Sequence, residues 1–176
     1  MPRIACLLLC VSFLARNAQA QEEPDSADVA SVDAIITALY DVISGPAGPR
    51  DWDRLRSLTT PSCRLTPTGR DSTGAAAHRT WTIDEYITAV SQYFDSNPFY
   101  EVEVARKEER FGNVVHAFST YVSYRSLDDD APFQRGINSI QVLFTRGRWW
   151  IHSVAWQPER PDLPIPEAYL PEDGNR

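Results

Sequence analysis

Few side chains in this sequence are suited to proton transfer at neutral pH. A general acid or base works best when its pKa lies near the working pH, which favours histidine or a carboxyl group in nonpolar surroundings. The chain has three histidines. His78 lies among small and polar residues, which is typical of an exposed loop. No residue stands out as catalytic, and the remaining candidates are His116, Glu103 and His152.

Other catalytic and cofactor signatures are missing from the sequence. It contains no glycine-rich phosphate loop, no HExxH pair, no paired cysteine ligands and no Gly-x-Ser-x-Gly elbow. The acidic run Asp128 to Asp130 lacks the alternating oxygen ligands and the glycine of a calcium loop. We therefore expect no cofactor and no metal.

The element that must position any site is a β-hairpin at Phe133 to Gln157, the most aromatic and β-prone stretch of the chain. Arg146-Gly147 is its predicted loop, because glycine supplies the positive φ that a short hairpin loop needs. This loop pairs Thr145 with Arg148, and strict alternation then assigns each side chain to a face. The predicted inner face carries Gly136, Asn138, Ile140, Val142 and Phe144 opposite Trp149, Ile151, Ser153, Ala155 and Gln157.

The inner set is apolar near the turn and becomes small and polar away from it, which suits a core that opens into a pocket. The outer face carries His152 and a large apolar group. Such a patch is unusual on a monomer, so we expect a homodimer that uses this face. Its predicted contact residues are Ile137, Leu143, Trp150, Val154 and Trp156. Alternatively, the proline-rich tail covers this patch.

A second hairpin is predicted from strands at Phe99 to Glu109 and Asn113 to Arg125, with Phe111-Gly112 as its loop. Its inward residues include Ser119 and Tyr121. Its outward residues include Glu101, Glu103 and His116. The expected ligand pocket is therefore lined by weak hydrogen-bonding groups and aromatic rings: Tyr40, Trp52, Ser119, Tyr121, Asn138 and Ser153.

Three helices are predicted before these strands. Asp28 to Ser44 carries one apolar stripe at helical spacing. Asp51 is suited to cap a short second helix. Thr82-Ile-Asp-Glu85 is a capping box that begins the third helix, and Asn97-Pro98 ends it. Between the second and third helices, Arg64 to Thr68 is predicted to be a short strand, and Gly69 to Thr80 a surface loop.

The first twenty residues have the three parts of a secretory signal peptide, namely a basic start, a short apolar run and the Ala18-Gln-Ala20 cleavage pattern. We expect an exported protein, periplasmic or extracellular, that is not held in the membrane after cleavage. Loss of Arg3 and Arg16 with the signal leaves 15 basic against 24 acidic residues, a net charge of −9. This charge argues against nucleic acid and anionic lipid as partners.

Cleavage also removes Cys6 and Cys10, so Cys63 remains alone and no disulfide within the chain is possible. A buried, inert thiol is favoured over a nucleophile, and an intermolecular disulfide stays open. The mature chain divides into a polar leader (21–27), one domain (28–157) and an extended tail (158–176) with five prolines.

The element order predicts an α+β fold, with three N-terminal helices packed on a curved, mostly antiparallel sheet. The sequence here resembles the nuclear transport factor 2-like superfamily, in its SnoaL-like, secreted bacterial branch. The matching segments are the helix end at Leu39-Tyr40, Asp51 to Leu58 leading into Cys63 to Leu65, and Gly147 to Gln157. The resemblance implies a cone-shaped half-barrel with a pocket between sheet and helices, and frequent homodimers across the sheet.

Enzymes of this superfamily place a carboxylate or histidine in the cone, and in its isomerases the base follows the first short strand. Here Pro61 to Arg70 contains no carboxylate. We therefore favour an exported, non-catalytic pocket protein that binds a small, largely apolar ligand or acts as an accessory or dimerisation module. The alternative is a small SnoaL-like lyase, isomerase or hydrolase with a His or Glu acid–base group in the cone.

Overall fold

The computed structural model describes residues 24–172. The predicted signal peptide (1–20) and the start of the leader lie outside this range, as do the last four residues. Within it, no helix is long and apolar enough to cross a membrane. The elements follow the order α1 Val32–Ile43, α2 Trp52–Leu58, β1 Thr59–Arg70, β2 Ala76–His78, α3 Ile83–Ser96, β3 Tyr100–Phe111, β4 Val114–Tyr124, β5 Gln134–Thr145, β6 Arg148–Pro158 and the 3₁₀ turn η1 Glu167–Tyr169.

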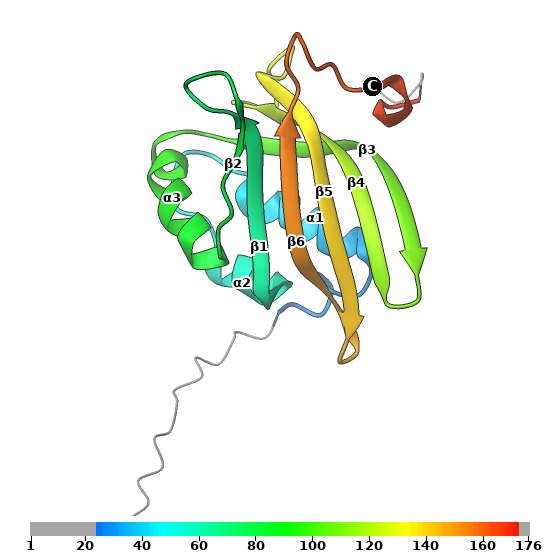
Figure 1. Cartoon of the computed structure of the whole chain (residues 1–176). Helices are drawn as coiled ribbons and strands as arrows, with labels where there is room; N and C mark the ends of the chain where they lie inside the picture. The colour runs from blue at the N-terminus through cyan, green and yellow to red at the C-terminus, as the bar shows by residue number, and fades with distance from the viewer. Residues whose placement is uncertain (1–23, 173–176) are drawn as a thin grey trace, which may run out of the picture.

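The six strands form one curved sheet in the order β2-β1-β6-β5-β4-β3 (Figure 1). Only β1 and β6 pair in parallel, and the other neighbours are antiparallel. Helix α1 crosses behind the sheet and covers its inner face, with α3 beside it. The predicted α+β fold, with three helices on a mostly antiparallel sheet, is confirmed.

The β5–β6 turn has the predicted loop. Arg146 and Gly147 both have positive φ, 54° and 79°, and Thr145 pairs with Arg148. The pairing then shifts at a β-bulge: Val142 faces Ile151, but Gln141 faces Ser153. His152 is therefore the extra residue, and every later side chain of β6 exchanges its face.

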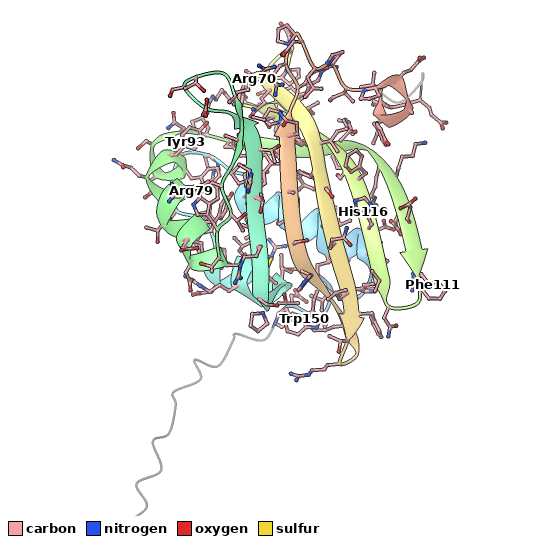
Figure 2. All side chains as sticks on the ribbon, in the orientation of Figure 1. Arg70, Arg79, Tyr93, Phe111, His116 and Trp150 are labelled. Atoms are coloured by element: carbon pink, nitrogen blue, oxygen red, sulfur yellow. The ribbon has the colours of Figure 1, made fainter. Side chains whose placement is uncertain are left out.

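This bulge makes part of the predicted hairpin wrong. Val154 and Trp156 turn inward, where Val154 is buried in the core and Trp156 packs against it. Ser153 lies on the outer face instead. Two of the five predicted dimer-contact residues are thus interior, whereas Trp150 lies on the outer face and His116 on the outer side of β4 (Figure 2).

A second bulge lies in β3 at Val104. Phe111 pairs with Val114, so the loop is Gly112-Asn113 instead of the predicted Phe111-Gly112. On the side of the bulge nearer the β3–β4 loop, Ala105 faces Thr120. On the other side, Glu103 faces Tyr121. The bulge turns Glu101 and Glu103 to the inner face with Tyr121. The prediction that these two carboxylates face outward is wrong.

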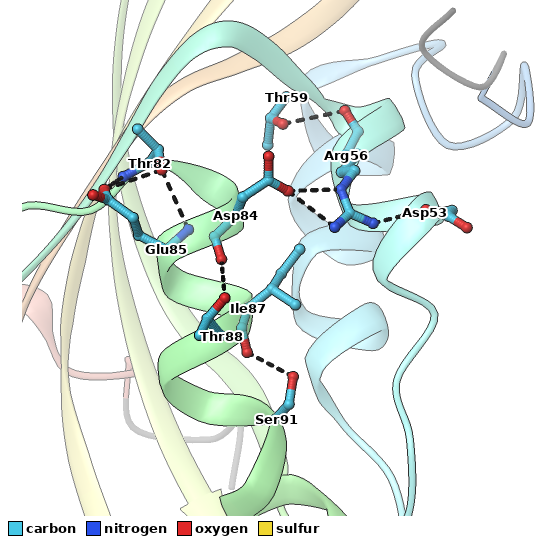
Figure 3. Close-up of polar contacts among 9 residues, drawn as sticks. All are labelled: Asp53, Arg56, Thr59, Thr82, Asp84, Glu85, Ile87, Thr88 and Ser91. Atoms are coloured by element: carbon cyan, nitrogen blue, oxygen red, sulfur yellow. Dashed lines mark hydrogen bonds and ion pairs between the residues drawn. The ribbon is translucent and has the colours of Figure 1, made fainter. Parts of the chain in front are cut away.

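The helices begin where the caps predict. The Asp51 carboxylate accepts a hydrogen bond of 2.9 Å from the backbone amide of Arg54. Both hydrogen bonds of the Thr82–Glu85 capping box are also present (Figure 3). Helix α1 starts later than the sequence suggests, at Val32, because Ser31 is its N-cap. The Arg56 guanidinium pairs with Asp53 within α2 and joins α2 to α3 by its ion pair with Asp84.

The segment predicted as a loop after β1 contains the short strand β2, which pairs with the end of β1 and extends the sheet by one edge strand. Strand β1 itself is longer than predicted. Its Cys63 is buried, and burial raises the pKa of this thiol to about 12. That setting is typical of a structural thiol and not of a nucleophile.

Candidate functional site

A cavity of about 310 Å³ lies between the inner face of the sheet and helices α1 and α3. Its wall is mostly apolar and aromatic. Leu39, Tyr40 and Ile43 come from α1; Tyr86, Ala89, Val90, Tyr93 and Phe94 come from α3; Leu55, Leu65, Phe99, Tyr121, Phe133, Val154 and Trp156 complete the nonpolar part. The polar groups in the wall are Glu101, Gln134 and Asn138. This volume is at the lower end of the roughly 300–1,000 Å³ of small-molecule sites.

The sheet and the first helix each supply part of the polar end. Tyr40 stands in the last turn of α1, on its buried face. Asn138 comes from the middle of β5, and Glu101 reaches inward because of the bulge at Val104. Gly136 leaves room for this arrangement, because a Cβ there would meet the Tyr121 hydroxyl oxygen at 2.5 Å.

Asn138 holds the centre of this network. Its Nδ2 donates to the Tyr40 hydroxyl at 3.0 Å and to Oε1 of Glu101 at 3.2 Å. The other carboxyl oxygen of Glu101 accepts the Ser123 hydroxyl at 3.1 Å. Because Asn138 and Ser123 approach from β5 and β4, the Glu101 carboxyl is fixed from two strands.

A second branch leads away from the cavity. Ser119 donates to Oε1 of Glu103 at 2.5 Å, so the Tyr40 hydroxyl must donate to Ser119 at 2.6 Å. Glu103 in turn lies 3.5 Å from Nε of Arg106, whose guanidinium also contacts Asp33. Glu103 is therefore an ion-paired structural carboxylate behind the cavity.

Burial changes the acid strength of these groups. Desolvation raises the pKa of Glu101 to about 7, while the hydrogen bonds from Asn138 and Ser123 act in the opposite direction. Burial also raises the pKa of the Tyr40, Tyr86 and Tyr121 phenols well above the usual range. Glu101 is the group here whose two protonation states are both accessible near neutral pH.

The predicted pocket residues divide into two groups. Tyr40, Tyr121 and Asn138 lie in the cavity wall, and Ser119 stands directly behind Tyr40. Trp52 packs against Tyr86 and Phe94 outside the wall, and Ser153 is on the opposite face of the sheet. Sequence reasoning missed Glu101 because the bulge that turns it inward has no signature in an alternating strand.

The two histidine candidates are both outside the cavity. His116 Nε2 lies 3.0 Å from Ser139 Oγ on the outer face, and His152 Nδ1 lies 3.2 Å from Thr60 Oγ1 at the bulge. The third candidate, Glu103, is held by Ser119 and Arg106. Across residues 24–172, no group of three or more His, Cys, Asp or Glu side chains is placed to hold a metal ion.

The outer face carries a second hollow, of about 390 Å³, between β5, β6 and the tail. The Tyr169 ring packs edge-on against Phe118 at 5.0 Å, and the Thr120 hydroxyl donates to the Tyr169 carbonyl at 2.6 Å. The tail therefore covers part of the face expected to form a dimer. Elsewhere on that face, the Arg148 guanidinium lies 3.4 Å from the centre of the Trp150 ring.

Comparison with solved structures finds similar folds at low sequence identity. A cystatin-like protein of unknown function from Nostoc punctiforme has a TM-score of 0.55 at 11% identity, over 76% of this chain and 91% of its own. An uncharacterized cystatin-like protein from Caulobacter vibrioides has a TM-score of 0.54 at 14% identity, over 74% and 89%. A protein assigned as the beta subunit of an aromatic-ring-hydroxylating dioxygenase from Novosphingobium aromaticivorans has a TM-score of 0.53 at 15% identity, over 80% and 94%.

No family model matches the chain, and neither does any curated protein. The structural neighbours include proteins of unknown function and an enzyme subunit, and a shared fold does not imply a shared activity. What the neighbours establish is the architecture predicted from the sequence. The chain has the cystatin-like, nuclear transport factor 2-like α+β fold.

Proposed function

We propose that this protein is an exported carrier or sensor whose cavity binds one small, largely apolar molecule. The observation that carries the proposal is the aromatic, apolar wall around a cavity of about 310 Å³, with Glu101 and Asn138 at one end. Such a wall supplies burial for the body of a ligand, and the polar end fixes its orientation. The ordered contacts of Glu101 and Asn138 within the protein mean that the polar end is preformed.

A neutral fluorescent probe of apolar sites, N-phenyl-1-naphthylamine, tests this function. We expect saturable binding with one site per chain. Val90→Phe fills the cavity from α3 and should weaken binding by about tenfold or more, which is about 1.4 kcal/mol. Thr88→Phe is the matched control, because Thr88 is exposed on the same helix and is not part of the cavity wall. Absence of saturable binding, or equal binding by Val90→Phe, would count against the pocket.

One observation favours a second function, general acid–base catalysis by Glu101. A carboxyl group with a pKa of about 7 can both accept and return a proton near neutral pH. His116, His152 and Glu103 are not placed for this role. Glu101 is the acid–base group in the cone that the enzymatic alternative requires.

Hydrogen exchange on a small apolar ketone tests the catalytic function without knowledge of a natural substrate. With 2-tetralone in deuterated buffer, we expect wild-type protein to accelerate α-hydrogen exchange, with a rate that rises through about pH 7. Glu101→Gln should lose the acceleration, whereas His116→Ala should keep it. If Glu101→Gln exchanges at the wild-type rate, Glu101 is not the base.

A further inference from the structure

Glu101 is the only charged side chain among the described residues that line the cavity. Within residues 24–172, no ion pair includes it. Its neighbour on the same face, Glu103, has Arg106 as a partner. A desolvated carboxylate without a cation is costly to bury, so an unpaired one that faces a cavity indicates a place for a positive ligand.

The hydrogen bonds around Glu101 also define what a ligand must provide. Each carboxyl oxygen receives one hydrogen bond, from Asn138 or Ser123, so lone pairs of both oxygens remain. The Asn138 amide hydrogens are already given to Tyr40 and Glu101. The hydrogen-bond donors of Asn138 and Ser123 are therefore fully engaged. The ionised carboxylate can still accept hydrogen bonds, which a ligand must donate.

The aromatic rings of the cavity wall also suit an organic cation. Faces of aromatic rings attract ammonium and guanidinium groups, and the wall contains rings from α3, β4 and β6. Three rings of the wall already lie against a guanidinium. Arg125 is 4.2 Å from the centre of the Phe133 ring and 5.5 Å from that of Tyr93, and Arg50 is 5.0 Å from the centre of the Phe94 ring. Arg50 is held by the backbone carbonyls of Ile43, Gly45, Pro46 and Gly48 instead of by Glu101.

We propose that the cavity takes an organic cation, namely a protonated amine or a quaternary ammonium group on an apolar body. The ammonium lies beside Glu101 and the body lies among the rings of α3 and Trp156. This inference rests on the proposed pocket function and names the ligand class of the same site. The net charge of −7 for the whole chain also favours the approach of a cation.

The charged and titratable groups that face Glu101 set the pH dependence. Tyr40 from α1, Tyr86 from α3 and Tyr121 from β4 are neutral phenols with raised pKa values, and Glu103 precedes the bulge on the same strand. Arg50 lies near Tyr86. Because the Glu101 pKa is about 7 in the empty cavity, affinity for a cation should rise as the pH passes through 7. It should fall again when an amine itself loses its proton.

A matched pair of small ligands tests the proposal by competition with N-phenyl-1-naphthylamine. At about pH 8, we expect benzylamine to bind at least about tenfold more tightly than benzyl alcohol. Between about pH 8 and pH 5.5 the affinity for benzylamine should fall by about tenfold, while that for the alcohol stays constant. Benzyltrimethylammonium, whose charge is permanent, should follow the same pH dependence.

Glu101→Gln should remove the preference for the amine, so that benzylamine and benzyl alcohol bind about equally, whereas Glu109→Gln, with a side chain 89% exposed, should behave as wild type. The wild-type comparison stands even if Glu101→Gln does not fold. Equal binding of amine and alcohol, or probe binding with no effect of either ligand, would overturn the cation proposal while the pocket function stands. Failure of the probe itself to bind would overturn both.

Discussion

The Asn138 side chain decides the chemistry of the cavity, because it holds Tyr40 and Glu101 in one arrangement. Each of its two amide hydrogens has a defined acceptor, so the side chain cannot turn without loss of both bonds. The chain of hydrogen bonds continues from Tyr40 through Ser119 to Glu103. A buried network in which each donor has one acceptor is rigid, and partial loss of it is costly.

Glu101→Gln should make the ligand-free protein more stable at about pH 8, by roughly 3 kcal/mol. The folded-state pKa of Glu101, about 7, is raised above its ordinary value of 4.5. Between these values the unfolded chain has released a proton that the folded chain keeps, so wild type loses stability as the pH rises through this window. Glutamine does not titrate, so the difference should disappear below about pH 4.5. Urea unfolding at a series of pH values measures it, and a constant difference at all pH values would contradict it.

Asn138→Leu should raise the Glu101 pKa further above 7, because the carboxylate loses a hydrogen bond that stabilises its charged form. The Tyr40 hydroxyl loses its donor as well, so we expect a loss of about 1–3 kcal/mol of stability. A ¹³C NMR titration of the Glu101 carboxyl carbon measures the pKa. Gln141→Leu, on the outer face of the same strand, is the control and should leave that pKa unchanged.

Two β-bulges determine which side chains reach the cavity. The bulge at Val104 turns Glu101 and Glu103 inward, and the bulge at His152 turns Val154 and Trp156 inward. In both strands apolar and polar side chains occur on each face, so alternation gives no sign of an extra residue. The local residue types are compatible with either register, and the cross-strand pairing selects one.

At the scale of a strand, Gly136→Ala should destabilise the protein by roughly 2 kcal/mol or more. Its Cβ would lie 2.5 Å from the Gln157 carbonyl oxygen and 2.5 Å from the Tyr121 hydroxyl oxygen, so a shift of the Tyr121 ring alone is not enough and the backbone of β5 or β6 must move as well. Gly69→Ala is the matched control, because Gly69 also lies in a strand and has nothing within 4 Å of its Cβ position. Denaturant midpoints compare the two. Equal midpoints would show that both the Tyr121 ring and the strand backbone move aside without cost.

For the molecule as a whole, the tail changes what the outer face of the sheet can do. The described part of the tail runs from Glu159 onward, and an ion pair of Glu159 with Arg135 fixes its start. Further along, Tyr169 packs on Phe118. The tail takes part of this face and borders the hollow that contains Ile137, which leaves Leu143 and Trp150 as the predicted dimer-contact residues outside that hollow.

The homodimer stays a prediction for this smaller surface. We expect wild type to sediment as a dimer at micromolar concentration, and Leu143→Lys to weaken association by about tenfold or more, because it places a charge in an apolar contact. Thr88→Lys is the control, because it adds the same charge at an exposed position of α3, which lies on the inner side of the sheet. A wild-type chain that sediments as a monomer would show that the tail, and not a partner, is the cover.

The sequence by itself determined the features that depend on neighbouring residues. Asp51 and the Thr82–Glu85 box gave the starts of two helices, and Arg146-Gly147 gave the turn of the central hairpin. These features are local, because a cap or a two-residue loop is stabilised by contacts within four or five positions. The order of the resulting elements was enough to predict helices on one side of a mostly antiparallel sheet.

Tertiary structure alone decided which carboxyl group faces the cavity. The inward turn of Glu101 and the outward turn of Ser153 depend on one extra residue in each of two strands, and that residue is set by pairing between strands far apart in sequence. The raised pKa of Glu101 depends in turn on burial by residues from several elements. Because both effects arise from long-range packing, the residue on which the site depends could not be found from local pattern.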